Sequence, residues 1–327
     1  MNRGPRALFG VPAPAKLNWF LHVLGRRADG MHELQTVFQF IDWCDELDFE
    51  WREDGQISRE GGPGLPEEDL CVRAARLLRE HTGARPGVHM RLRKRVPAQA
   101  GLGGGSSDAA TVLLALNLLW GLGLRRAELQ QLGARLGADV PVFVFGRDAF
   151  AQGVGEQLRA LRLPAWNMLI AWPGEGLSTA QVFSHDLLTR NTPACTMEGF
   201  CEHLKRGLEG RRPGSEAGGE AGSETGSPAI DARTMRGLLG FGANDLQPAA
   251  MELLPKLRRL QDWLARQGGA DGGDAVRMSG SGSAMFVPMD PAAAGGTEGF
   301  AGEVPAGWTV RMCRSLSEHP LRDWAPD

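Results

Sequence analysis

The residues with the clearest chemical potential form a glycine-rich stretch, Pro97-Ala-Gln-Ala-Gly-Leu-Gly-Gly-Gly-Ser-Ser-Asp108, which runs directly into a long apolar segment. Glycine adopts positive φ and lets the backbone approach a ligand closely. At the start of a helix, successive free N–H groups form an anion site. The stretch lacks the Gly-Lys-Ser/Thr of a Walker P-loop, and the third glycine of a Rossmann fingerprint would fall on Ser106. We therefore predict a phosphate-binding loop of another type.

Two further stretches place a charged residue among apolar ones. Leu136-Gly-Ala-Asp-Val-Pro-Val-Phe143 puts Asp139 at the start of a short element. A helix N-cap is the simpler interpretation of this residue alone, although a helix N-terminus also keeps a catalytic carboxylate ionised. In Pro12-Ala-Pro-Ala-Lys-Leu-Asn18, strand alternation puts Lys16 and Asn18 on the same face. That face is either solvated or part of a site.

The elements that must position these residues alternate between strands and helices. Apolar or alternating runs predict strands at 15–23, 34–43, 88–96 and 167–172. Helical spacing predicts helices at 70–81, 106–120, 128–136 and 253–267. Gly83 and Gly137 end the first and third of these helices. A second glycine-rich turn, Ser279–Ser283, lies between apolar stretches.

The length of 327 residues is typical of two domains. We place their boundary near Pro164, which gives residues 1–164 and 165–327. Residues 210–228 contain mostly Gly, Ser, Glu and Ala and no aromatic residue. Such a segment buries too little apolar surface to offset its ordering entropy, so it is predicted to be a disordered surface insertion.

Composition argues against several classes of partner. With a net charge of -3, the chain offers no strong field to nucleic acid or acidic lipid. The longest apolar run, 111–120, contains Asn117 and is too short to span a bilayer. The five cysteines include no C-x-x-C pair, which is typical of reduced thiols in a cytoplasmic protein without a zinc site. We expect a small-molecule substrate, no nucleic acid and no membrane.

Three motifs, in this order, resemble those of the GHMP kinases: Ala-Lys-Leu-Asn at 15–18, Gly-Leu-Gly-Gly-Gly-Ser-Ser at 101–107, and Met-Ser-Gly-Ser-Gly-Ser at 278–283. That set leaves homoserine, galactose and mevalonate kinases open. Residues 27–34, 136–143 and 188–193 also resemble the family that acts on 4-diphosphocytidyl-2-C-methyl-D-erythritol, and Asn244-Asp-Leu246 adds a weaker match. The resemblance covers essentially the whole chain apart from 210–228, with 268–274 as a further candidate exception.

The resemblance implies an α/β (α+β) two-domain GHMP kinase fold. Its N-terminal domain would be ribosomal-S5-like, its C-terminal domain ferredoxin-like, and the active site would lie in the cleft between them. It also implies transfer of the ATP γ-phosphoryl group to the 2-hydroxyl of the cytidine diphosphate-linked methylerythritol, in the non-mevalonate pathway of isoprenoid precursor synthesis. Such transfer is mainly positioning and charge stabilisation, with Mg²⁺ accompanying ATP.

By the same resemblance, Asp139 takes the hydroxyl proton and Lys16 supports it. ATP would be bound by Pro97, Ala98, Gln99, Ala100, Gly101, Leu102, Gly103, Gly104, Gly105, Ser106 and Ser107. The substrate would be bound by Asn18, Met31, His32, Thr179 and Phe183. His32 reads the cytosine edge and Phe183 supplies an aromatic wall. The Mg²⁺ ligand is unknown, with Ser107 as a candidate.

The chain departs from the family pattern at three positions. Met31 replaces a tyrosine expected to stack on cytosine, Gln99 replaces a glycine of the ATP loop, and Asp69 replaces an asparagine near the adenine. A thioether still packs on a ring face, so the nucleobase slot is expected to persist.

Two alternatives stay open. One is another GHMP kinase, such as homoserine kinase, against which residues 27–34 argue. The other is a regulator or binding protein that keeps the fold without activity, against which Lys16 and Asp139 argue. We expect a cytoplasmic monomer or weak homodimer.

Overall fold

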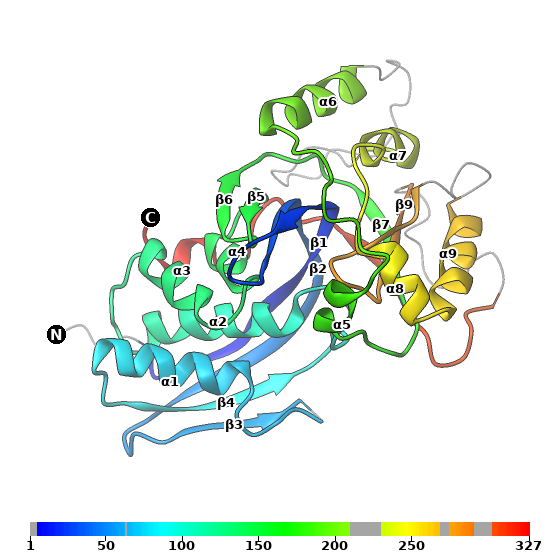
Figure 1. Ribbon diagram of the computed structural model, residues 1–327. Helices are drawn as coiled ribbons and strands as arrows, with labels where there is room; N and C mark the ends of the chain where they lie inside the picture. Colours follow the sequence, from blue (N-terminus) through cyan, green and yellow to red (C-terminus); the bar gives the residue numbers. More distant parts are fainter. Residues whose placement is uncertain (1–4, 63, 210–229, 269–274, 291–302) are drawn as a thin grey trace, which may run out of the picture.

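The computed structural model describes residues 5–62, 64–209, 230–268, 275–290 and 303–327, and within these ranges the chain builds two sheets (Figure 1). The first has the order β3-β4-β2-β5-β6, with β1 also paired to β2, and the second has the order β10-β7-β9-β8. The strands are β1 (Ala7–Arg26), β2 (His32–Arg52), β3 (Ile57–Gly61), β4 (Gly87–Arg93), β5 (Ala149–Gly153), β6 (Gln157–Ala160), β7 (Asn167–Trp172), β8 (Arg277–Met278), β9 (Met285–Met289) and β10 (Thr309–Arg314). The insertion predicted at 210–228 lies outside the described residues.

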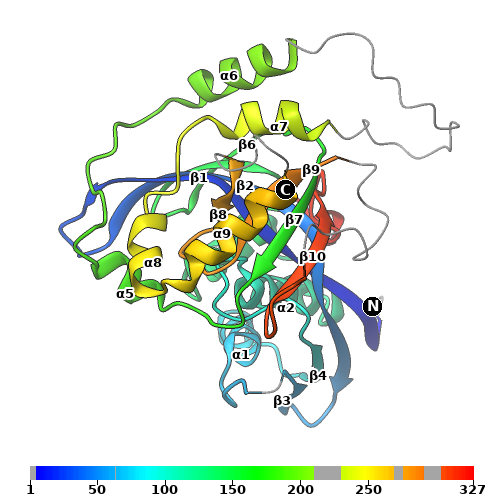
Figure 2. The same ribbon diagram turned by 90° about the vertical axis from the view of Figure 1, so that its right-hand side faces the viewer.

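Helices cover each sheet. Those that pack with the first sheet are α1 (Leu70–Thr82), α2 (Gly104–Leu119), α3 (Arg126–Ala134) and α4 (Val140–Phe145). Those of the second half are α5 (Thr179–Ser184), α6 (Met197–Glu209), α7 (Ala232–Leu239), α8 (Gln247–Leu253) and α9 (Lys256–Gln267). Figure 2 shows α9 crossing the second sheet, where it packs on β7 and β9. Among the described residues, no helix combines the length and the apolar character needed to cross a membrane.

The central part of β2 is buried on both faces, because it lies between the helices and the second sheet. Phe38 and Phe40 point into the cluster shared with α1–α4, while Val37 and Ile41 point into the cluster shared with the second sheet. This is the period-two alternation of a strand, with both faces apolar. The first sheet therefore joins the two cores, and residues on β1 and β2 can reach both halves of the molecule.

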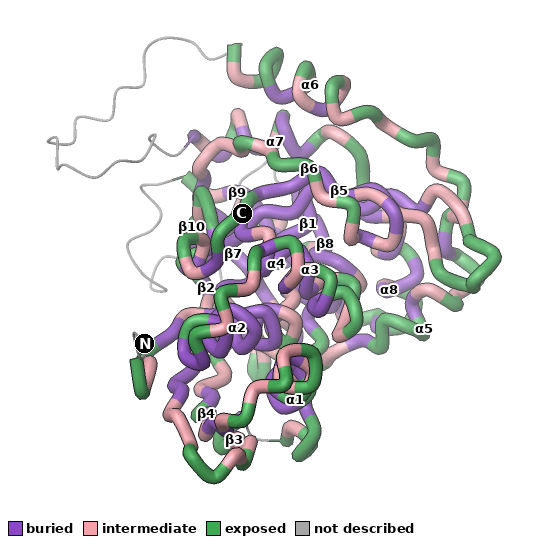
Figure 3. Tube along the Cα trace, turned by 90° about the vertical axis from the view of Figure 1, so that its left-hand side faces the viewer, coloured by how far each residue is buried: buried purple, intermediate pink, exposed green. Residues whose placement is uncertain are grey.

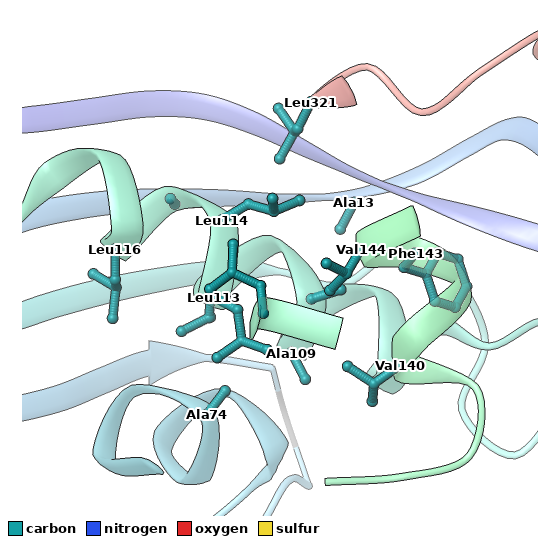
Figure 4. Close-up of a cluster of buried hydrophobic side chains, with 14 of the residues drawn as sticks. Ala13, Ala74, Ala109, Leu113, Leu114, Leu116, Val140, Phe143, Val144 and Leu321 are labelled. Atoms are coloured by element: carbon teal, nitrogen blue, oxygen red, sulfur yellow. The ribbon is translucent and has the colours of Figure 1, made fainter. Parts of the chain in front are cut away.

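Helix α2 is buried along most of its length, as its nearly uninterrupted apolar sequence predicts (Figure 3). In Figure 4, Ala109 and Leu113 of α2 lie near Ala74 of α1, and Val140 and Phe143 of α4 lie beside the same helix. The glycine-rich stretch that precedes α2 is thus attached to a rigid element.

The predicted elements are largely present, with two corrections. The helix expected at 128–136, with Gly137 at its end, is α3, which runs from Arg126 to Ala134 and has Arg135 as its C-cap. The helix expected at 253–267 begins three residues later, since α9 runs from Lys256 to Gln267 and Leu253 is the last residue of α8. Pro255 between them has no N–H to continue the helical bonding. The short element at 140–145 is a helix, α4, which carries Pro141 in its first turn and ends at Gly146 in the left-handed conformation.

A buried amide links the two sheets near the expected domain boundary. Gln39 Oε1 on β2 accepts from Trp19 Nε1 at 2.9 Å and from Trp166 Nε1 at 2.6 Å. Its Nε2 donates to Pro164 O at 3.2 Å and to Asp148 Oδ2 at 3.3 Å. A buried amide with all of its groups bonded holds its neighbours in one arrangement. The division at residue 164 stays a prediction.

The C-terminal segment returns to the first sheet and its helices. Arg126 of α3 donates to Val144 O and Ala325 O, both at 2.6 Å, and to Arg322 O. His319 is 1% exposed and contacts the ring of Phe40, with centroids 5.5 Å apart. Burial, followed by the charge of Arg126, lowers the pKa of His319 to about 3.

This pKa predicts a loss of stability in acid. Unfolded His319 binds a proton below its ordinary pKa of 6.5, whereas the folded protein excludes it until about pH 3. The unfolded state therefore binds more protons in this window, and stability falls as the pH falls. Between pH 7.5 and 5.0, wild type should lose about 2 kcal/mol more than His319→Gln, measured by denaturant unfolding. Parallel losses in the two proteins would contradict the prediction.

Candidate active site

A cavity of about 1070 Å³ lies where the two halves meet. Its walls come from the glycine-rich stretch, the β1–β2 hairpin, the start of α4, the segment from Leu177 to Arg190, and the turn between β8 and β9. The predicted site residues that line it are Lys16, Asn18, Met31, His32, Pro97, Ala98, Gln99, Ala100, Gly101, Gly103, Gly104, Gly105, Ser106, Asp139, Thr179 and Phe183. Sequence positions more than 150 residues apart thus meet at one place.

Lys16 is a buried cation at the centre of this site. Its side chain is 2% exposed, and its Nζ donates to Asn18 Oδ1 at 2.6 Å and to Gly101 O at 2.7 Å. Asp139 Oδ2 lies 3.6 Å from the same nitrogen. Burial lowers the pKa of Lys16, and the charge of Asp139 opposes that shift. The shared face of Lys16 and Asn18 is therefore part of the site and is not solvated.

Asp139 stands just before α4, but its carboxylate does not act as a side-chain cap. Its side chain is 36% exposed in the cavity and interacts with Lys16. Of the two interpretations that the sequence leaves open, the contacts favour the carboxylate that faces the cavity. An ionised oxygen beside an ammonium and open to a ligand can accept a proton.

The glycine-rich stretch has the conformation that phosphate binding needs. Gly101 and Gly103 have φ of 74° and 73°, and Gly103 is the N-cap of α2. Because the first turn of a helix has no internal acceptor for its N–H groups, those of Gly104, Gly105 and Ser106 are free for an anion. These three residues line the cavity, so an anion bound there would lie within it.

The third motif, residues 278–283, helps to fix the glycine-rich stretch through hydrogen bonds. Ser279 Oγ donates to Gly101 O at 2.9 Å, and Ala284 N donates to Ala100 O at 3.0 Å. Asn244 Nδ2 in turn donates to the carbonyls of Met278 and Gly280, at 2.7 and 2.8 Å. The loop that would carry the phosphates is therefore fixed by both halves of the chain.

Two of the departures, Gln99 and Asp69, have well-defined surroundings in the structure. Gln99 has φ 53°, the one positive value of a non-glycine among the described residues. Gly176 packs so close to Gln99 that a Cβ added to Gly176 would lie 2.4 Å from the Cβ of Gln99. Asp69 caps α1 by accepting from Val72 N at 3.1 Å and pairs with Arg59 at 3.1 Å, so its carboxylate has a cation partner.

The far end of the cavity carries the residues expected to recognise a base. The rings of His32 and Phe183 stack with centroids 4.9 Å apart and planes tilted by 30°. Met31 is 50% exposed at the turn between β1 and β2. Thr179 Oγ1 lies 2.8 Å from Ser281 Oγ, and Asn18 Nδ2 donates to Thr36 Oγ1 at 2.8 Å. These side chains line the same cavity as the glycine-rich stretch.

Two predicted residues are not among those that line the cavity: Leu102 and Ser107 are buried behind the loop. The Ser107 hydroxyl has no hydrogen-bond partner, and its role as a metal ligand stays a prediction. In the described ranges, no three acidic, His or Cys side chains are grouped as a metal site.

Sequence reasoning missed several cavity residues. The most informative is Arg190, which lies within the Leu-Thr-Arg-Asn-Thr-Pro stretch but received no role. Gly280 and Ser281 lie in the third motif and also line the cavity. The motifs contained these residues, but only the fold shows which of them face the ligand space.

Comparison with known proteins shows the class of protein to which this chain belongs. Residues 69–147 match the family described as GHMP kinases N terminal domain, and residues 228–296 match GHMP kinases C terminal. The first range contains the glycine-rich stretch and Asp139, and the second contains the turn at 279–283. The chain therefore has the N-terminal and C-terminal domains of a GHMP kinase.

Closer relatives give the particular family. The chain is 45% identical to 4-diphosphocytidyl-2-C-methyl-D-erythritol kinase of Variovorax paradoxus over 98% of this chain and 99% of that protein. It is 47% identical to the same-named protein of Verminephrobacter eiseniae, with the same coverage. A crystal structure titled 4-(cytidine 5'-diphospho)-2C-methyl-D-erythritol kinase matches with a TM-score of 0.67 and 32% identity, over 93% of this chain and 98% of that chain. The chain belongs to the 4-diphosphocytidyl-2-C-methyl-D-erythritol kinase family.

A glycine substitution tests whether the loop depends on the third motif. In Gly101→Ala, the new Cβ would lie 2.0 Å from Ser279 O, at a backbone φ of 74°. Gly123→Ala is the matched control, because its φ is 68° and nothing lies within 4 Å. The control should lose about 1–2 kcal/mol of stability from strain alone. Gly101→Ala should lose more and bind a non-hydrolysable ATP analogue at least about tenfold more weakly, by calorimetry. Equal behaviour of the two variants would contradict this.

Proposed function

We propose that this chain transfers the γ-phosphoryl group of ATP to the 2-hydroxyl of 4-diphosphocytidyl-2-C-methyl-D-erythritol. The observation that carries the proposal is one cavity that holds the glycine-rich loop, the Lys16–Asp139 pair and the 27–34 hairpin turn. The pathway implied is the non-mevalonate synthesis of isoprenoid precursors.

Asp139 would act as the proton acceptor. As the substrate 2-hydroxyl oxygen forms its bond to the γ-phosphorus, the bond from that phosphorus to the β–γ bridging oxygen breaks and ADP leaves. The hydroxyl proton passes to the Asp139 carboxylate, which is open to the cavity. Its neighbour Lys16 lies with Nζ 3.6 Å from Asp139 Oδ2 and pairs with the carboxylate.

Lys16 would also stabilise charge on the moving phosphoryl group. Its Nζ has neutral oxygen partners on two sides, Asn18 Oδ1 and Gly101 O, and both fix its position. A preorganised cation in a water-poor site stabilises developing negative charge more than a mobile surface lysine would. The N–H groups of the glycine-rich loop would hold the phosphates beside the Lys16 ammonium.

Mg²⁺, bound with ATP, would supply further neutralisation of the phosphate oxygens. The residues of this chain position the nucleotide, while Ser106, at the first turn of α2 and on the cavity wall, offers a hydroxyl near the phosphates. Ser107 remains a candidate ligand of the Mg²⁺ ion in this proposal. The protein would act in the cytoplasm as a monomer or a weak homodimer.

A panel of acceptors tests the function directly. ATP consumption should be high with 4-diphosphocytidyl-2-C-methyl-D-erythritol and low with mevalonate, homoserine and galactose. The panel separates the proposal from both alternatives, since another GHMP kinase would prefer a different acceptor and a protein without activity would use none. Preference for homoserine or mevalonate would overturn the proposal.

The role of Asp139 gives a sharper prediction. Asp139→Asn keeps the size of the side chain but cannot take a proton, and the carboxylate makes no cap bond whose loss would confuse the result. We expect kcat to fall by roughly 100-fold or more while the protein stays folded. Near-normal turnover by the folded Asn variant would exclude Asp139 as the base.

The departure at Met31 predicts unequal contributions from the two walls of the base site. Base–aromatic stacking on Phe183 contributes about 1–3 kcal/mol, whereas a thioether–ring contact contributes about 0.3–1.5 kcal/mol. Phe183→Ala should therefore raise KM for the cytidine substrate more than Met31→Ala does, with KM for ATP unchanged. Equal effects on both substrates, with a lower melting temperature, would place Phe183 in the core instead.

A further inference from the structure

Arg190 is bound to the loop that follows α5 and also reaches His32. Its Nη2 donates to Phe183 O at 2.9 Å and to His185 O at 3.1 Å, and its Nη1 donates to Leu188 O at 3.2 Å. Its Nε donates to His32 Nε2 at 3.3 Å. Arg190 and His32 both line the main cavity. The guanidinium is thus held by three carbonyls while one of its N–H groups is directed at the imidazole.

This contact decides which imidazole nitrogen carries the hydrogen. A guanidinium has five donors and no acceptor, so the nitrogen that faces Arg190 must be unprotonated. In neutral imidazole the other nitrogen, Nδ1, then carries the N–H. Burial lowers the pKa of His32, and the charges of Arg190 and Arg26 lower it further, so the ring stays neutral at pH 7.

Nδ1 is the nitrogen that remains free for a ligand. No residue in the described ranges hydrogen bonds to it, and it is not among their buried atoms that lack a partner. The imidazole therefore offers a donor and no acceptor to whatever occupies this part of the cavity.

We propose that Arg190 is a positioning residue that fixes the His32 tautomer, so that His32 Nδ1–H donates to the unprotonated N3 of cytosine and rejects the N3–H of uracil. The inference rests on the proposed function, because it assumes that a pyrimidine reaches His32. Cytosine N3 has a lone pair, whereas uracil N3 carries a hydrogen and would meet the histidine donor with another donor. Two facing donors leave both unsatisfied, and this cost in binding free energy discriminates against uracil.

Two substitutions separate the tautomer from the loop contacts. Arg190→Gln introduces an amide that can donate to or accept from His32 Nε2, so both tautomers become possible. Arg190→Lys keeps a group that only donates, although it loses the fork that bonds three carbonyls. If the tautomer is what matters, Lys preserves base selectivity and Gln does not. Arg159→Gln, outside the cavity on β6, is the control for loss of an arginine charge.

The first readout is independent of catalysis. Nitrogen-15 NMR of histidine-labelled protein distinguishes the two neutral tautomers directly. His32, assigned through His32→Gln, should show the Nδ1–H form in wild type and in Arg190→Lys, and a mixture in Arg190→Gln. An Nε2–H form in the wild-type protein would overturn the inference whatever the enzyme's activity.

The second readout is selectivity. CDP and UDP are titrated with the ATP site filled by a non-hydrolysable analogue. Wild type, Arg190→Lys and Arg159→Gln should prefer CDP by about tenfold or more, and Arg190→Gln should lose most of that preference. In Arg190→Gln, KM for the cytidine substrate should rise about tenfold, with kcat and KM for ATP within about twofold. Retained selectivity in Arg190→Gln, or a parallel loss in the Lys variant, would overturn the inference. Failure of the proposed function is a different result, in which neither CDP nor the cytidine substrate binds the wild-type protein.

Discussion

The burial of the Lys16 ammonium is the constraint on which the rest of the site depends. A charge that is 2% exposed must be surrounded by oxygen atoms, since removing it from water costs several kcal/mol otherwise. Those oxygens come from Asn18 on the same strand, Gly101 in the glycine-rich loop, and Asp139 before α4. The first strand therefore fixes the relative positions of the glycine-rich loop and the Asp139 carboxylate, and any loop conformation that withdraws the Gly101 carbonyl removes one of the partners of a buried cation.

The contacts of Gly101 explain why the loop contains glycine at that point. Gly101 O accepts from Lys16 and from Ser279, and at φ 74° an added Cβ would lie 2.0 Å from Ser279 O. Turning the Gly101 carbonyl inward leaves the N–H groups at the start of α2 for the ligand. Gln99 adopts a left-handed conformation without being glycine, and close packing of Gly176 and the bond from Leu177 N at 3.2 Å hold it there.

Sequence predicts best where a local rule and the tertiary structure agree. The N-terminal and C-terminal limits of α1 follow from Asp69 and Gly83, and the burial of α2 follows from its apolar composition. Strand alternation alone places Lys16 and Asn18 on the same face. It does not determine whether that face is exposed to solvent, because this depends on Gly101, which is 85 residues from Lys16 in the sequence. For Asp139 the local rule suggests a cap, and only the position of Lys16 shows that the carboxylate has another partner.

The two ends of the cavity differ in how they are built, and this difference bears on substrate choice. The phosphate end is made from buried groups that several elements hold at once, so a change there disturbs the core. The other end consists of a hairpin turn with Met31 half-exposed and a loop clamped by Arg190. Homoserine kinase from Cytophaga hutchinsonii, at 16% identity, shares the fold with a TM-score of 0.61. A likeness at such low identity shows the fold and does not define the acceptor, because one fold hosts different substrates.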